Sequence, residues 1–171
     1  MKIKNIIITG GLGFIGNNLA KYLVKENKNI TILDNSYRGN IKNISNIKNQ
    51  IKIVKCDLLE KKNIKIALKG IDTIIHCAAI NGTKNFYNNP SLVLDVGVAG
   101  LINLVESCKD KKIDNFFLAS SSEVYHLPKQ IPPSEKVKMV IPDVYNPRYS
   151  YAGSKIFSEL YAIHKCSKIF K

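Results

Sequence analysis

The chain has 171 residues, of which 45% are hydrophobic and 23% are charged. These proportions are typical of a globular protein with one core, and they exclude a disordered or fibrous chain. The formal net charge is +13. Because the lysines are scattered and only Arg38 and Arg148 are arginines, we interpret this charge as compositional and do not expect a nucleic-acid partner.

The cysteines and the apolar runs exclude further classes. Cys56, Cys77, Cys108 and Cys166 are widely spaced and form no Cys-x-x-Cys pair, so we expect buried free thiols and no metal site. No apolar run approaches the roughly 20 residues of a membrane span, and the first nine residues are too short for a signal peptide. We therefore expect a cytoplasmic protein with no membrane partner.

Apolar periodicity predicts that strands and helices alternate from the start of the chain. Residues 3–9 form an apolar, β-branched run that ends in glycines, which is typical of a strand buried on both faces. Helical spacing of apolar residues predicts a helix over residues 14–25, and residues 29–34 form the second predicted strand. Residues 35–50 are rich in Asn, Ser and Lys, so we expect a long connection with at most a short helix.

The same alternation continues through the middle of the chain. Residues 51–55 and 73–77 form the third and fourth predicted strands, with a weak helix over residues 59–69 between them. Pro90 suits the first turn of a helix that runs to about residue 109.

The last elements complete a sheet. Residues 115–119 form the fifth predicted strand, the proline-rich residues 120–148 are expected to be mostly loop, and residues 149–168 form the last predicted helix. Strands joined by helical crossovers imply a parallel sheet covered on both faces. We therefore predict an α/β Rossmann-type doubly wound sheet with strand order 3-2-1-4-5, which binds its ligand where the order reverses.

A glycine-rich segment joins the first predicted strand to the first predicted helix: Gly11-Leu12-Gly13-Phe14-Ile15-Gly16. Such glycines let the backbone approach a pyrophosphate, although a plain strand-to-helix turn would also explain them. Asp34 ends the second strand, where a carboxylate can bind the adenosine ribose and repel a 2′-phosphate. Unless it is only a solvated surface carboxylate, Asp34 favours NAD over NADP, and Arg38 nearby could soften that preference.

Tyr151 and Lys155 are four residues apart in the last predicted helix and share one face. A nearby ammonium can lower the pKa of a phenol from its ordinary value near ~10, which would let Tyr151 act as a base. Such pairs also occur by chance on exposed helices. The glycine segment and the serines after the fifth strand favour the chemical interpretation here.

Together these residues resemble the extended short-chain dehydrogenases/reductases, the group of NAD-dependent nucleotide-sugar epimerases and dehydratases. The motifs that carry the resemblance span the whole chain in the family's order: Thr9-Gly10-Gly11-Leu12-Gly13-Phe14-Ile15-Gly16, Asp34-Asn35-Ser36, Cys56-Asp57-Leu58, His76-Cys77-Ala78-Ala79, Ser120-Ser121-Ser122-Glu123-Val124-Tyr125 and Tyr151-Ala152-Gly153-Ser154-Lys155. The resemblance implies NAD as the cofactor, a nucleotide sugar as the substrate and a homodimer as a possible assembly.

The resemblance also implies which residues bind NAD. They are Gly10, Gly13, Phe14, Ile15, Gly16, Asp34, Asn35, Ser36, Asp57, Leu58, Ala78, Ala79, Lys84, Tyr151 and Lys155. In this assignment Asp57 and Leu58 border the adenine, Ala78 and Ala79 line the phosphate and nicotinamide side, and Lys84 reaches the nicotinamide ribose. From the sequence, strand-end turns explain these residues equally well.

The catalytic residues implied are Ser121, Tyr151, Lys155 and Glu123. Tyr151 would accept the proton of a sugar hydroxyl, Ser121 would relay that proton, and Lys155 would hold the cofactor ribose. Glu123 occupies a position at which members that eliminate water or decarboxylate often have an acid, whereas a loop glutamate can also be merely solvated.

Two residues depart from the family pattern. Gly97 stands where the family usually has Asn, and His126 replaces a common glycine.

The chain also ends where the family's carboxyl-terminal substrate half usually begins. We therefore expect residues 1–171 to be one NAD-binding Rossmann domain that includes the Tyr-x-x-x-Lys helix, without the substrate domain. The alternatives are a catalytically silent NAD-binding domain and, from its charge, a nucleic-acid-binding protein.

Overall fold

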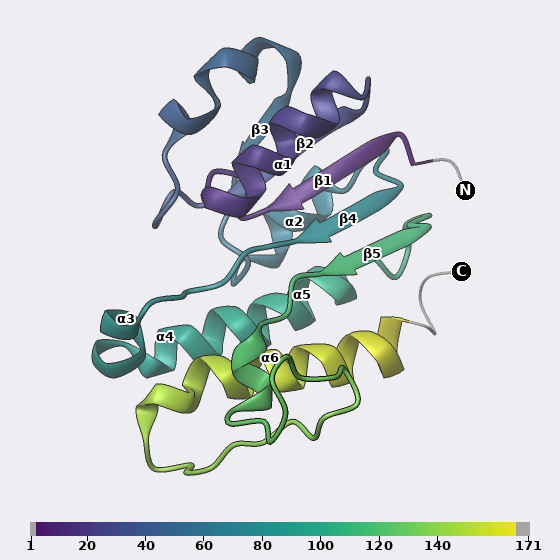
Figure 1. Ribbon diagram of the computed structural model, residues 1–171. Coiled ribbons are helices and arrows are strands. Elements are labelled where there is room, and N and C mark those ends of the chain that lie inside the picture. The colour runs from purple at the N-terminus through teal and green to yellow at the C-terminus, as the bar shows by residue number, and fades with distance from the viewer. Residues whose placement is uncertain (1–2, 167–171) are drawn as a thin grey trace.

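The computed structural model describes residues 3–166 and contains one parallel sheet (Figure 1). Its strands are β1 (Asn5–Thr9), β2 (Asn29–Asp34), β3 (Lys52–Lys55), β4 (Thr73–His76) and β5 (Asn115–Leu118). Their order is β3-β2-β1-β4-β5, which confirms the predicted topology. All the strand ends lie within two residues of the predicted boundaries.

Strand β1 lies at the centre of the sheet and is buried on both faces. Ile7 pairs with Thr31 of β2 on one side and with Ile74 of β4 on the other. Successive side chains point to opposite faces, so Ile7 packs into one core cluster while Ile6 and Ile8 pack into the other. Burial on both faces explains why the strand reads as a continuous apolar run.

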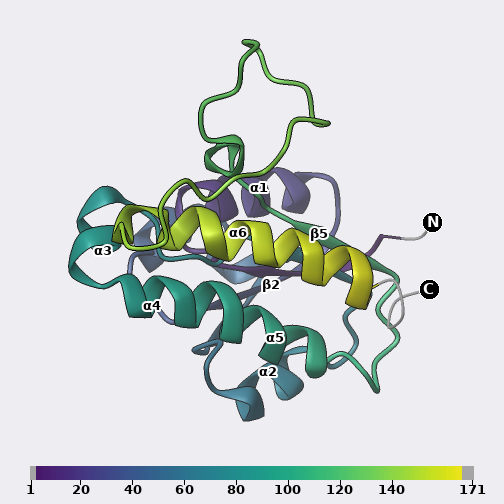
Figure 2. The ribbon, with the colours of Figure 1, turned by 90° about the horizontal axis from the view of Figure 1, so that it is seen from below.

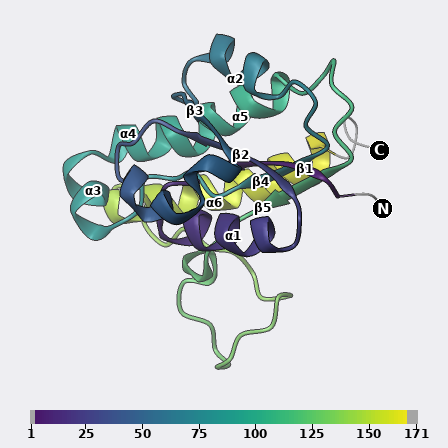
Figure 3. The same ribbon diagram turned by 90° about the horizontal axis from the view of Figure 1, so that it is seen from above.

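Helices cover both faces of the sheet, as predicted (Figure 3). Helix α1 (Phe14–Lys25) and the 3-10 segment η1 (Ile41–Gln50) cover one face, and helices α2 (Lys61–Ala67) and α5 (Gly100–Glu106) cover the other. The segment η1 is longer than the short helix we expected. It bends at Ile44, and its buried Ile44 and Ile47 hold the otherwise polar connection against the core.

The helical region before β5 differs from the single helix expected over residues 90–109. It consists of α4 (Pro90–Leu94), a π-helical turn η2 (Asp95–Ala99) and α5, which ends at Glu106. The π turn is wider than an α-helical turn and so interrupts the helical periodicity. An apolar pattern taken over the whole segment does not reveal this interruption. A further short helix, α3 (Thr83–Asn88), was not expected, and it is anchored by the buried Phe86.

The last helix, α6 (Ser150–Tyr161), continues into the π-helical segment η5 (Ala162–Cys166). Residues 167 and 168 of the predicted helix lie outside the described residues. Between β5 and α6 the chain is mostly loop, as expected, apart from the 3-10 turns η3 (Ser122–Tyr125) and η4 (Pro147–Tyr149). This loop stands away from the rest of the protein (Figure 2).

Helix α6 runs beside α4 and α5, and a glycine sets how closely they approach (Figure 2). A Cβ atom added to Gly97 would lie 2.6 Å from the Ser154 Cβ and 2.7 Å from its Oγ. The Ser158 hydroxyl donates to the Gly97 carbonyl over 3.3 Å. Because Tyr151 and Lys155 project from the same helix, this contact also fixes their distance from the sheet.

We predict that Gly97→Ala destabilises the protein by about 1–3 kcal/mol, because the methyl group overpacks the contact with Ser154. Denaturant unfolding measures this change. Gly153→Ala on α6 is the matched control, since its Cβ would meet only the Ile141 side chain, at 3.1 Å, and alanine favours a helix. Adding Ser154→Gly to Gly97→Ala should recover part of the loss. Equal stability of Gly97→Ala and the parent chain would show that α6 moves away freely.

Candidate functional site

A cavity of about 780 Å³ opens at the carboxyl ends of the strands, where the order reverses between β1 and β4. This volume lies within the range of small-molecule sites, roughly 300–1,000 Å³. The expected residues that line it are Gly10, Gly13, Phe14, Ile15, Gly16, Asp34, Asn35, Asp57, Leu58, Ala78, Ala79, Tyr151 and Lys155. Residues far apart in the sequence thus meet at one end of the sheet (Figure 1).

The glycine turn forms the floor of the cavity by direct backbone packing. Gly10 has a φ of +67°, and a Cβ there would lie 2.8 Å from the backbone of Ala78. A Cβ on Gly16 would collide with the Gly10 carbonyl oxygen and lie 2.7 Å from the Gly11 Cα. Helix α1 then begins at Phe14 with no side-chain cap on its first N–H groups. Such a turn, with donors left open at a helix start, suits a pyrophosphate.

Acidic side chains are fixed at the ends of β2 and β3. Asp34 accepts from the Leu12 N–H over 3.0 Å and from the Ser36 N–H over 2.7 Å. The Asn35 amide donates to Asp57 over 3.0 Å. Ser36 thus contacts Asp34 through its backbone N–H, and Ser36 is not among the residues that line the cavity. These bonds hold the Asp34 carboxylate at the rim, where a ribose would be recognised.

Some predictions for the loop after β4 differ from the structure. Lys84 lies on α3, is exposed and is not among the residues that line the cavity. Instead Asn81 lines it, and the Arg38 guanidinium reaches across to donate to the Asn81 carbonyl. Asn81 was not predicted, although a polar residue shortly after Ala78 and Ala79 could have indicated it.

Lys155 is buried beside the cavity, with 5% of its surface exposed. Its ammonium donates to the Ala119 carbonyl over 2.6 Å and lies 5.7 Å from the centre of the Tyr151 ring. Burial lowers the pKa of Lys155, while the neighbouring Cys77 and Glu159 act in the opposite direction. The structure thus brings the predicted Tyr151 and Lys155 pair to the cavity wall.

The pKa of Tyr151 lies above its ordinary value, contrary to our expectation that Lys155 would lower it. Burial is the largest cause, and the negative charge of Glu123 is the second. A hydrogen bond with the Ser121 side chain and the charge of Arg38 act in the opposite direction. In this structure, therefore, Ser121 and Arg38 rather than Lys155 favour the phenolate.

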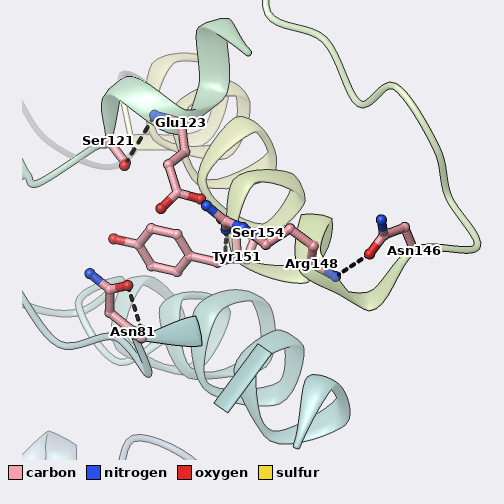
Figure 4. A network of polar contacts seen from close by, with 8 residues as sticks. Asn81, Ser121, Glu123, Asn146, Arg148, Tyr151 and Ser154 are labelled. Atoms are coloured by element: carbon pink, nitrogen blue, oxygen red, sulfur yellow. Dashed lines mark hydrogen bonds and ion pairs between the residues drawn. The ribbon is translucent and has the colours of Figure 1, made fainter. Parts of the chain in front are cut away.

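Ser121 and Glu123 lie beside Tyr151 but are not among the residues that line the cavity (Figure 4). The Ser121 hydroxyl accepts from the Glu123 N–H over 3.3 Å, which starts the turn η3. The Glu123 carboxylate accepts a hydrogen bond from the Arg148 guanidinium over 2.7 Å. Ser120, which was not predicted as a site residue, lines the cavity and donates to Glu159.

Beneath the site, a buried polar pair joins β1 to β4. The Thr9 hydroxyl lies 2.7 Å from Nδ1 of His76, and it accepts from the Ala78 N–H over 3.3 Å. Burial, followed by the nearby charge of Lys155, lowers the pKa of His76 to about 3. His76 is therefore neutral at physiological pH and adds no positive charge beside Lys155.

The part of the chain that the structure describes offers no group of His, Cys, Asp or Glu side chains that could hold a metal ion. All the cysteines are free thiols. Within residues 3–166, no helix is both long and apolar enough to cross a membrane.

The fold and the cavity define a doubly wound α/β domain with a dinucleotide-type glycine turn. Residues 6–168 match the family described as "NAD dependent epimerase/dehydratase family". The chain belongs to this family.

Individual relatives agree with this assignment. The chain is 35% identical over 158 residues to a putative UDP-glucose 4-epimerase of Methanocaldococcus jannaschii, covering 91% of this chain and 49% of that protein. It is 34% identical to the UDP-N-acetyl-alpha-D-glucosaminuronate decarboxylase of Bacillus cytotoxicus, with 91% and 48% covered.

A solved structure agrees as well. The UDP-N-acetylglucosamine 4-epimerase of Methanobrevibacter ruminantium M1 superposes with a TM-score of 0.85 at 28% identity, over 99% of this chain and 52% of that one. The chain thus spans about half the length of the curated relatives it matches.

The buried His76 predicts a specific loss of stability in mild acid. Between its ordinary pKa of 6.5 and its folded pKa of about 3, the unfolded chain binds a proton that the folded chain does not. Stability therefore falls as the pH drops below 6.5, and His76 alone should remove about 2 kcal/mol between pH 7 and pH 5.

Urea unfolding at both pH values tests this prediction. His76→Gln should lose less stability on acidification than the parent chain, whereas the control His126→Gln, at an exposed site, should lose as much. An unchanged loss in His76→Gln would contradict a neutral, buried His76.

Proposed function

We propose that the chain is the cofactor-binding and catalytic half of an NAD-dependent nucleotide-sugar epimerase or dehydratase. The observation that carries this proposal is that Tyr151 and Lys155 line the same cavity as the glycine turn of residues 10–16. A proton acceptor and a cofactor site must share one cavity for a sugar to be oxidised there. Membership of the family supports the same chemistry.

The cofactor we propose is NAD, and the cavity fits it in two respects. The turn leaves no room for a Cβ atom at Gly10 and Gly16 and little room at Gly13, so backbone N–H groups can meet a pyrophosphate. Asp34 is held at the rim by backbone donors and would face the adenosine ribose. When bound there, NAD would supply the hydride acceptor and, after rotation or elimination in the sugar, the hydride donor.

The chain's own residues would move the proton. Tyr151 would take the proton from the sugar hydroxyl, and Ser121 can pass it on because it bonds to the phenol. The raised pKa of Tyr151 means that a positive charge must favour the phenolate. Arg38 already acts in this direction, and a bound oxidised nicotinamide would supply a further positive charge.

The substrate class we propose is a nucleotide sugar, because the named relatives act on UDP-sugars. These relatives include both an epimerase and a decarboxylase. Glu123 is held by Arg148 rather than free, which favours an electrostatic role over that of a mobile acid. A homodimer stays a prediction.

A catalytically silent NAD-binding module is the second candidate, because the chain spans about half of its relatives. Incubation with UDP-sugars and NAD, followed by chromatography of the products, separates the two functions. Conversion that Tyr151→Phe abolishes supports the enzyme. Binding of NAD without conversion supports the silent module, and failure to bind NAD excludes both.

We predict that NAD binds several-fold more tightly than NADP, because the Asp34 carboxylate repels a 2′-phosphate. Calorimetric titration of both cofactors measures the ratio. Asp34→Asn should bring the two affinities closer, whereas Asp110→Asn, an exposed carboxylate remote from the cavity, should leave the ratio unchanged. Equal affinities in the parent chain would remove Asp34 from this role.

We also predict that Tyr151→Phe leaves the affinity for NAD nearly unchanged, because the phenol acts mainly on the reacting sugar. Lys155→Met should weaken NAD binding roughly tenfold, since it removes a cation from the cavity wall. Both variants are compared by titration after circular dichroism has shown that they fold. Identical binding by Lys155→Met and the parent chain would contradict a cofactor contact at Lys155.

A further inference from the structure

The phenol of Tyr151 lies in a cluster of side chains that come from different elements, of which Figure 4 shows Glu123, Arg148 and Tyr151. The members are Phe86 of α3, Glu123 of η3, Arg148 of η4 and Tyr151 itself on α6. Tyr151 has been assigned a chemical role, but Arg148 and Phe86 have not. Arg148 also ends the long loop that follows η3, so it connects this loop to the site.

Two contacts join Arg148 to neighbours of Tyr151. Its guanidinium donates to the Glu123 carboxylate over 2.7 Å, and it also lies over the Phe86 ring, 4.9 Å from the ring centre. The Phe86 ring stacks on Tyr151, with centres 5.4 Å apart and planes 18° from parallel. Arg148 is thus bound to a charged and to an apolar neighbour of the same phenol.

The charges around the phenol come from several elements. Glu123 opposes loss of the Tyr151 proton, whereas Arg38, from the loop after β2, favours it. Lys155 lies one helical turn away on α6. Arg148 interacts electrostatically with Glu123, Tyr87 and Tyr149. Its ion pair with Glu123 links Arg148 to a charge that acts on Tyr151.

Stability alone does not account for the ion pair between Glu123 and Arg148. Their side chains are 30% and 34% exposed, and such partly solvated pairs contribute about 0–1 kcal/mol. An unpaired carboxylate next to Tyr151 would, however, act directly on a group that has to lose a proton. The location of the pair matters more than its strength.

We propose that Arg148 is a positioning residue for Tyr151, which holds the Glu123 carboxylate and the Phe86 ring beside the phenol and offsets the negative charge of Glu123. This inference rests on the proposed function, in which the phenol is the base. In this proposal Glu123 is a fixed negative charge beside Tyr151. Removal of Arg148 should make Tyr151 harder to ionise, and removal of Glu123 should make it easier.

Titration of the phenol tests the proposal without requiring turnover. Carbon-13 at Cζ of tyrosine reports ionisation by nuclear magnetic resonance, and Tyr151→Phe identifies the signal. We expect Arg148→Met to raise the pKa of Tyr151 by about half a pH unit and Glu123→Gln to lower it by a similar amount. The ionised fraction at pH 10 ranks the variants even where a higher pH unfolds them.

A double-variant cycle separates an indirect effect from a direct one. In the Glu123→Gln background, Arg148→Met should shift the titration of Tyr151 less than it does in the parent chain, because only the direct effect of the guanidinium charge remains. Arg148→Lys keeps the cation and should retain most of the parent behaviour. Lys109→Met is the matched control, since it also breaks an ion pair, with Glu106 on α5, and should not shift Tyr151.

Three outcomes would overturn the proposal. They are an unchanged titration in Arg148→Met, an equal shift with and without Glu123, and an equal shift in Lys109→Met. Binding of NAD is measured separately on the same variants. If the chain binds no NAD but the double-variant cycle gives the expected shifts, the proposed function is refuted and the electrostatic role of Arg148 is retained. If the chain binds NAD but the cycle does not give these shifts, the proposed function is retained and the role of Arg148 is refuted.

Discussion

The burial of one cation, the Lys155 ammonium, is the constraint on which the site depends. An ammonium removed from water costs several kcal/mol unless it finds partners. Here the Ala119 carbonyl at the end of β5 accepts from it, which ties α6 to the sheet. The same charge helps to keep His76 neutral and favours the thiolate of Cys77, although burial outweighs this effect on Cys77. One cation thus influences two neighbouring ionisable groups at the end of β4.

The second requirement is close backbone contact in the glycine turn that forms the floor of the cavity. The turn that carries Gly10 and Gly16 packs against Ala78 and against itself with no space for a Cβ atom. Because β1 and β4 are neighbours, this packing brings the turn next to the strand that leads to Asn81. A closely packed backbone turn and a buried cation therefore line the same cavity, which a dinucleotide would fill.

The topology, the glycine turn and the Tyr151 and Lys155 pair could be predicted because each depends on local pattern. The strands are apolar runs, and the pair is set by helical spacing. The π turn at residues 95–99 and the helix α3 could not, because tertiary packing at Gly97 and Phe86 fixes them. The expected direction of the Tyr151 pKa shift was wrong for a similar reason. That pKa depends on burial and on the charge of Glu123, and both effects arise only when the chain folds.

The end of the sheet away from the cavity has an anchor of its own. The Asp72 carboxylate accepts from the N–H groups of Lys4 and Asn5 and from the Thr73 hydroxyl, and so joins the start of β1 to the start of β4. Since the parallel strands all point toward the cavity (Figure 1), this anchor lies a full strand length from it. A protein immobilised on a sensor surface through its amino end would therefore present its cofactor cavity to the solution, away from the support.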